Sequence, residues 1–162
     1  MKLLKRIYLI KLKPLIISII IPLLIGGLSG LLTRGNISVF ASLNKPPLTP
    51  PAIVFPIVWT ILYILMGISA YLIYISDSRY KSDALRAYAL QLIVNFFWSI
   101  IFFNFNAYLF AFIWLVLLWI LILIMIISFC KIDKTAAYLQ IRYLIWVTFA
   151  GYLNLSIFLL NR

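Results

Sequence analysis

The eight residues Asn44–Pro51 read NKPPLTPP, and long apolar runs lie on both sides of them. Each proline fixes its own φ angle and pushes the residue before it toward an extended conformation, so this stretch cannot be helical. Pro51 falls where a following helix would have its first turn, a position at which the missing N–H costs no hydrogen bond. The stretch therefore predicts a stiff connector between two helices.

The composition around this connector is that of a membrane protein. Of the 162 residues, 66% are hydrophobic and 10% are charged, whereas soluble domains carry about a quarter charged residues. A soluble chain of this length has too little interior to bury so much apolar surface, so the bilayer must supply the apolar surroundings. We expect a single integral membrane domain over residues 1–162.

Five apolar runs are long enough to cross about 30 Å of hydrocarbon as helices. They are apolar on all sides rather than alternating, which excludes a membrane β-barrel. The first run is longer than a signal-peptide core and no small-residue cleavage site follows it, so we expect it to be the first helix. The fold class is all-α, a bundle of five transmembrane helices at about 14–33, 52–75, 86–104, 108–130 and 135–160, with a connector at 34–51.

The distribution of Lys and Arg predicts the orientation, because basic residues are enriched in cytoplasmic connectors. With the N-terminus inside, ten basic residues lie on the inner side and three, Arg34, Lys45 and Arg162, on the outer side. Arg142 alone lies within a helix. We therefore expect a cytoplasmic N-terminus and an outer proline-rich connector, with the plasma membrane as the host. The ten inner residues are Lys2, Lys5, Arg6, Lys11, Lys13, Arg79, Lys81, Arg86, Lys131 and Lys134.

Several function classes are excluded by composition. The net charge of +11 sits at the ends of apolar runs rather than on one basic face, which argues against nucleic-acid binding. The single Cys130 cannot form an intramolecular disulfide, and a chain without His or Glu, with only Asp77, Asp83 and Asp133, offers no metal cluster. We expect no conventional catalytic residues, no metal site and no required cofactor.

An eighteen-residue connector exceeds what two antiparallel helices need, and long connectors in compact proteins are often lids. A tight exit from the first helix is the structural alternative. Residues spaced by four predict what lies beneath a lid, because they stack on one helix face. Three helices carry such polar or aromatic faces: Trp59, Tyr63 and Gly67; Gln91, Asn95 and Trp98; and Arg142, Trp146, Ala150 and Asn154.

Each of these groups also has a structural explanation. Asn95 and Asn154 are equally typical of hydrogen bonds between helices. Trp59, Trp114 and Trp119 are typical of packing or of the interfacial aromatic belt. Gly26 and Gly30 form a G-x-x-x-G pair, which predicts close helix packing within the bundle or between protomers.

Three stretches of the chain carry specific motifs. They are LNKPPLTPPAIVFPIVWTILYILMGISAYLIY, QLIVNFFWSIIFF and YLIWVTFAGYLNLSIFLLN. Their motifs are K-P-x-x-x-P-P before W-x-x-L-Y, Q-L-x-x-N-x-x-W, and W-x-x-F-A-x-x-L-N. With these motifs the chain resembles, from about Leu31 to Asn161, the translocator protein family, also called TspO/MBR or tryptophan-rich sensory proteins.

The resemblance implies a five-helix protein, commonly a homodimer, that binds porphyrins such as protoporphyrin IX and often sterol-like lipids or benzodiazepine-type ligands. Its implied pocket comprises Trp59, Asn95, Trp98, Trp146, Ala150 and Asn154, beneath a lid that contains Pro46, Pro47, Leu48, Pro50 and Pro51. Arg34 and Lys45 would face the carboxylates of a porphyrin or, alternatively, lipid headgroups.

Three positions depart from the family pattern. Leu48 replaces the usual loop tryptophan, Trp114 aligns with a common aspartate, and Arg142 stands where a proline is typical. Arg142 could snorkel to the interface, pair between helices or contact a ligand.

Three functions follow from the resemblance and remain open at this point. The first is binding, sensing or transport of porphyrins and related lipophilic ligands. The second is light-dependent porphyrin degradation through tryptophan chemistry, which the loss of tryptophan at position 48 disfavours. The third is sterol or lipid translocation.

Overall fold

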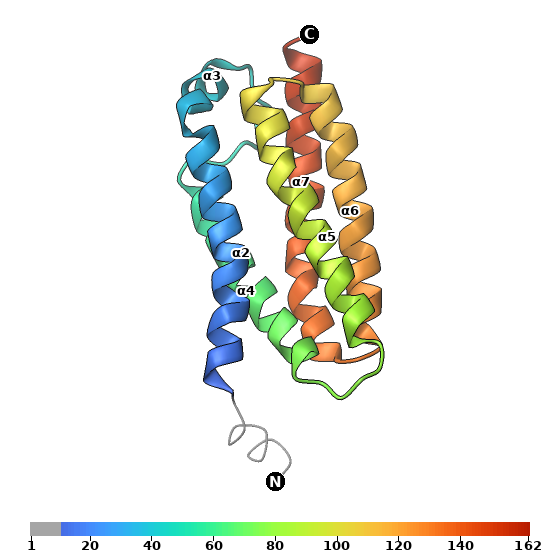
Figure 1. The fold of residues 1–162 in the computed structure, drawn as a ribbon. Helices are drawn as coiled ribbons and strands as arrows, with labels where there is room; N and C mark the ends of the chain where they lie inside the picture. The colour runs from blue at the N-terminus through green and yellow to red at the C-terminus, as the bar shows by residue number, and fades with distance from the viewer. Residues whose placement is uncertain (1–10) are drawn as a thin grey trace.

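A computed structural model of the chain describes residues 11–162, and Lys2, Lys5 and Arg6 lie outside this range. The described residues form helices and no strand (Figure 1). Five helical spans are long and apolar enough to cross a membrane, which confirms the all-α five-helix bundle. The spans are built from α2 (Leu12–Thr33) continued by α3 (Ile37–Ser42), α4 (Val54–Tyr74), α5 (Lys81–Ser99), α6 (Tyr108–Cys130) and α7 (Lys134–Leu160).

The first span is longer than the sequence predicted. A 3₁₀ turn, Arg34–Asn36, links α2 to α3, so helical structure extends to Ser42 and the irregular loop is only 43–53 rather than 34–51. Residues 34–43 contain no proline, so no residue in this segment breaks the helix before the proline stretch begins. Asn36 stabilises the extension by donating its Nδ2 to Asn104 Oδ1 at 2.9 Å.

The end of α5 also helps to fix this end of the bundle. A π-helical turn over Ile100–Asn104 ends α5, and Asn104 Nδ2 donates to the Leu32 carbonyl of α2 at 3.1 Å. The loop-side ends of the first and third spans are thereby joined. The loop, the α5–α6 turn and the C-terminus lie at one end of the molecule, opposite the described start of α2 (Figure 1).

The proline-rich loop is fastened to the far end of the chain. Asn161 accepts the Asn44 N–H at its Oδ1 and donates its Nδ2 to the Asn44 carbonyl, each at 2.9 Å. Pro46 is buried, and its carbonyl accepts the Thr49 N–H at 3.0 Å to form a turn. The loop is therefore held at both its entry and its turn.

α2 joins the bundle mainly through α4. A Cβ on Gly67 would lie 2.6 Å from the Ser18 carbonyl oxygen and 2.5 Å from Ile19 Cα, so the two helix backbones are in direct contact there. Pro22 lies inside α2 and has no N–H to donate to that Ser18 carbonyl. Most of the remaining surface of α2 is exposed and apolar, as a lipid-facing helix requires.

α5 begins earlier than predicted, at Lys81 rather than 86. Its first turn is charged, with Arg86 donating to Asp83 at 3.1 Å. An apolar run does not include such a charged turn, so the prediction began the helix too late. At the same end of the molecule, Asp133 caps α7 by accepting the Ala136 N–H at 3.0 Å.

Candidate functional site

The predicted polar residues of α4, α5 and α7 do converge in the interior of the bundle. Asn95 on α5 donates its Nδ2 to the Tyr63 hydroxyl of α4 at 3.1 Å. Trp98 donates its indole N–H to Asn154 Oδ1 of α7 at 3.2 Å, and Asn154 in turn donates to the Tyr108 carbonyl of α6 at 2.8 Å. One side chain thus links three helices. In this state Asn95 and Asn154 act as interhelical hydrogen-bonding groups.

A second polar layer lies farther from the loop end of the bundle. The Tyr143 hydroxyl donates to Gln91 Oε1 at 3.0 Å, joining α7 to α5. Gln140 donates to the Leu65 carbonyl of α4 at 3.4 Å. All three side chains are almost fully buried, and these bonds satisfy part of the polarity that burial in a membrane protein requires.

Aromatic rings fill the space between these polar layers and the loop. Trp59 stacks on Tyr63 at a centroid distance of 5.5 Å and meets Tyr143 edge-on at 6.1 Å. Trp146 meets Phe55 edge-on at 6.0 Å, and Phe55 continues the contacts to Phe40 of α3 at 6.4 Å. The rings of Trp146, Phe55 and Phe40 therefore form a chain from the middle of α7 to α3, the element that precedes the loop.

Trp146 differs from Trp98, Trp114 and Trp119 in its hydrogen bonding. Its indole N–H is buried and has no partner among the described residues. The Trp114 indole donates to the Val94 carbonyl at 2.8 Å, and the Trp119 indole donates to Thr148 Oγ1 at 2.9 Å. Trp114 and Trp119 are thus explained by packing and interhelical bonding, whereas Trp146 holds a free donor beside an aromatic cluster.

Ala150 lies on the same helix as Trp146 and is buried, whereas Arg142 is exposed on the outside of α7. The structure does not bring Arg142 to the other predicted residues. Four-residue steps advance by 400°, so the predicted face drifts by 40° per step and Arg142 lies about 120° around the helix from Asn154. The inward position is taken by Tyr143 instead, which spacings of three and four around Gln140, Val147 and Asn154 would have indicated.

The lid residues divide into two sets. Pro46 is buried and Pro50 is half-buried, whereas Pro47, Leu48 and Pro51 are exposed. Leu48 is 68% exposed, so the position where the family carries a tryptophan points away from the bundle here. Lys45 lies over the Phe40 ring at 5.1 Å and donates to the Ala41 carbonyl at 2.8 Å. No pattern in the sequence indicated that Phe40 and Phe55 would pack together beside this loop.

The glycine pair on α2 behaves asymmetrically. A Cβ on Gly26 would collide with the Tyr63 ring of α4, so Gly26 is needed for packing within the bundle. A Cβ on Gly30 would meet nothing within 4 Å. The two glycines therefore do not form one packing surface inside this chain.

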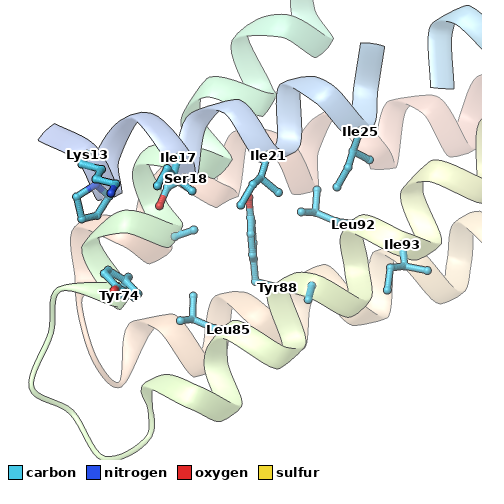
Figure 2. Close-up of a pocket in the computed structure, with 13 residues that line it drawn as sticks. Lys13, Ile17, Ser18, Ile21, Ile25, Tyr74, Leu85, Tyr88, Leu92 and Ile93 are labelled. Carbon is cyan, nitrogen blue, oxygen red and sulfur yellow. The ribbon is translucent and has the colours of Figure 1, made fainter. Parts of the chain in front are cut away.

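A separate cavity of about 640 Å³ lies between α2, α4 and α5 near the described start of α2 (Figure 2). Its wall includes Tyr88 and Leu92 of α5 and Ile21 of α2, none of which the sequence singled out. The cavity contains none of the residues predicted to bind a ligand.

The sequence of this chain is similar to those of known proteins. The TspO/MBR family matches residues 18–160. The chain therefore belongs to the TspO/MBR family, a family of helical membrane proteins.

Individual relatives extend over most of the chain. The "Tryptophan-rich protein TspO" of Chlorobaculum tepidum is 38% identical over 126 residues, which are 75% of this chain and 78% of that protein. A protein of the same name from Archaeoglobus fulgidus is 35% identical over 152 residues, 91% of this chain and 96% of its own. The "Translocator protein" of Bos taurus is 33% identical over 139 residues, 83% and 82% of the two chains.

Proposed function

We propose that the protein binds porphyrins such as protoporphyrin IX, and similar flat lipophilic carboxylates, in the space between α4, α5 and α7 beneath the proline-rich loop. In this proposal Trp59, Trp98 and Trp146 provide aromatic faces, and Asn95 and Asn154 exchange their present partners for the ligand. The loop and Phe40 move aside to admit it. The family membership supports a membrane-embedded binding or transport role for these residues.

The observation that carries the proposal is the unpartnered indole N–H of Trp146. A buried donor without an acceptor is unfavourable in a membrane interior, and it is retained here beside the rings of Phe55 and Phe149. An acceptor group on an aromatic ligand would relieve that donor while its ring stacks on the cluster. The site thus offers both kinds of contact that a tetrapyrrole needs.

Charge at the outer end suits an anionic ligand. Arg34, Lys45 and Arg162 lie there, and all three aspartates of the sequence lie at the opposite end, Asp77 and Asp133 in connectors and Asp83 in the first turn of α5. Lys45 is already positioned over the Phe40 ring, next to the aromatic cluster. A carboxylate that emerges beneath the loop would meet cations and no acidic side chain.

We further propose that the loop end faces outward across the plasma membrane. Among the described residues, seven basic side chains lie at or near the end opposite the loop, against three at the loop end. That asymmetry is typical of a cytoplasmic end. Ligand would then enter from the outer side.

A titration in the dark tests the binding proposal. Detergent-purified protein is titrated with protoporphyrin IX, and tryptophan quenching gives the dissociation constant for the wild type, Trp146→Phe and Trp119→Phe. Loss of one hydrogen bond to a buried donor predicts about a tenfold weakening for Trp146→Phe. Trp119→Phe is the matched control, because its indole already has a partner outside the proposed site.

Two results would overturn the proposal. Absence of saturable quenching would remove porphyrin as a ligand, and equal weakening by both variants would show that the site does not involve Trp146. Illumination of the complex separates binding from degradation: a stable porphyrin band supports a binding protein, and a light-driven loss that needs Trp146 would establish an enzyme.

A further inference from the structure

The cavity between α2, α4 and α5 has the size and polarity of a binding site. Its volume of about 640 Å³ falls within the 300–1,000 Å³ that is usual for sites of small ligands. Its lining is apolar except at Lys13, Ser18, Tyr74 and Tyr88. It shares no residue with the porphyrin site proposed above.

The packing of α2 explains why the cavity exists. Contact with Gly67 fixes the Ser18–Ile19 backbone against α4, and Lys11 donates its N–H to the Tyr71 hydroxyl at 3.0 Å. α2 is therefore held on α4 at two points. The inner half of α5 is left apart from α2, with the cavity between them (Figure 2).

Tyr88 provides an unusual polar group in this cavity. Its side chain is 7% exposed, and its hydroxyl has no hydrogen-bond partner among the described residues. Figure 2 shows the ring standing between α5 and α2 with its oxygen toward Ile21. A buried hydroxyl in apolar surroundings without a partner is unfavourable, so the position favours a ligand that carries an acceptor.

The cavity is open to the bilayer along its length. Ile17 and Ile21 of α2 and Ile93 of α5 line it and are also 46–53% exposed. From Lys13 to Ile25 the lining extends for about 18 Å along α2 at the rise of a helix. One leaflet of the hydrocarbon core is about 15 Å thick, so the cavity has the depth of a single acyl chain.

Lys13 supplies a cation at the inner mouth of this apolar space. It lies in the first turn of α2 and is exposed beside the cavity (Figure 2). Basic residues at a pocket between transmembrane helices are typical of sites for anionic lipid headgroups. No acidic side chain lines the cavity.

We propose that this cavity binds an anionic phospholipid of the bilayer. One acyl chain occupies the space between α2 and α5. An ester carbonyl accepts a hydrogen bond from the Tyr88 hydroxyl, and the phosphate pairs with Lys13. The lipid thereby fills the cavity that remains between α2 and α5 because α2 packs against α4.

Native mass spectrometry of the full-length protein with phosphatidylglycerol or phosphatidylcholine tests this site. The wild type is expected to retain one phosphatidylglycerol in preference to phosphatidylcholine. Lys13→Gln should lower phosphatidylglycerol affinity about fivefold, the effect of one basic residue near a membrane surface, and leave phosphatidylcholine unchanged. Lys131→Gln is the matched control, because Lys131 is exposed at the same end and does not line the cavity.

A cavity-filling variant tests the position of the acyl chain. Ala89→Trp should abolish retention of both lipids, and Ala89→Leu should weaken it, provided that circular dichroism shows an unchanged helix content. Ala89 lines the cavity but is exposed, so the larger side chain does not disturb the core. Ile124→Trp, an exposed position on α6, controls for a new surface tryptophan.

Three outcomes would overturn the proposal. Equal losses in Lys13→Gln and Lys131→Gln would show that only the overall charge of this end attracts the lipid. Undiminished retention in Ala89→Trp would place the chain outside the cavity. A lipid-free dimer that Ala89→Trp dissociates would show that a second copy of the chain covers this surface.

Discussion

Tyr88 and Tyr143 are two buried tyrosines in opposite circumstances. The Tyr143 hydroxyl donates to Gln91, whereas the Tyr88 hydroxyl has no partner among the described residues. Both side chains are buried. The difference in what their hydroxyls contribute to the free energy of unfolding therefore comes from one hydrogen bond. An unmade bond at a buried hydroxyl is more unfavourable than the complete absence of the hydroxyl.

The two tyrosines therefore predict stability changes of opposite sign. In detergent without phospholipid, Tyr88→Phe should raise the free energy of unfolding by about 1 kcal/mol, and Tyr143→Phe should lower it by about 1 kcal/mol. Thermal unfolding followed by circular dichroism measures both. A destabilised Tyr88→Phe protein would mean that its hydroxyl has a partner in the folded protein.

At the residue scale, the interior position of some polar side chains could be predicted because their spacing along the helix coincides with its buried face. Asn95, Trp98 and Asn154 all lie in the interior, where Asn95 bonds to Tyr63 and Trp98 bonds to Asn154. Arg142 does not, since a face drawn in steps of four drifts around the helix by about 120° over twelve residues. Tyr143 was missed for the same reason, because spacings of three and four, rather than steps of four, place it on the buried face.

At the scale of elements, the closest approach of α2 to the bundle is a direct contact between the backbones of α2 and α4. Gly67 on α4 lies directly against the Ser18–Ile19 backbone, whereas Gly30 on α2 faces open space. Since backbone atoms cannot move aside as a flexible side chain can, a methyl group at Gly67 must displace the whole helix.

The two glycines form a matched pair for testing this attachment. Gly67→Ala should lower the free energy of unfolding by about 1–3 kcal/mol through overpacking. Gly30→Ala should raise it by about 0.5–1 kcal/mol, because alanine is the better helix former and meets no neighbour. Chemical unfolding in mixed micelles measures both values. A neutral Gly67→Ala would show that α2 is not held closely on α4.

The proline-rich loop is the second element whose position rests on few contacts. Asn161 holds Asn44 through two hydrogen bonds. Asn161→Ala should increase hydrogen exchange across residues 43–53 about tenfold, the effect of losing a little over 1 kcal/mol. Arg162→Ala is the control, because it alters the neighbouring residue and leaves both bonds intact. Unchanged exchange in Asn161→Ala would show that the prolines alone hold the loop.

Element boundaries were predictable where a residue type enforces them. The four prolines of 44–51 end helical structure, and the sequence placed that break correctly. It did not predict that helix would persist through Ser42, because the helical extension depends on the contact of Asn36 with Asn104, sixty-eight residues away. A contact between residues so far apart in the chain cannot be predicted from the local sequence.

At the scale of the whole molecule, the two ends of the bundle differ in charge and in chemistry. The loop end holds the aromatic cluster and few charges, and the opposite end holds most of the basic residues and the apolar cavity. The number and apolar character of the spans followed from composition alone. The cavity could not be predicted from the sequence, because it depends on the spacing between α2 and α5 in the folded bundle, which hydrophobic periodicity does not describe.

Membrane orientation can be tested with two cysteine positions. Leu48→Cys in a Cys130→Ala background should react with an impermeant maleimide on intact cells. The native Cys130, which is exposed at the end of α6, should react only after permeabilisation. The basic residues at the Cys130 end predict this result. Reversed labelling would invert the proposed orientation.

The position of bound porphyrin relative to these two cysteines tests the central proposal most directly. A fluorophore is attached either to Leu48→Cys in the Cys130→Ala background or to the native Cys130, and its quenching by protoporphyrin IX is measured in the dark. The bundle is about 40 Å long, judged from the 27 residues of α7, so energy transfer distinguishes its ends. We predict saturable quenching that is strong at position 48 and weak at Cys130. Stronger quenching at Cys130 would place the porphyrin in the inner half of the bundle and contradict a binding site beneath the loop.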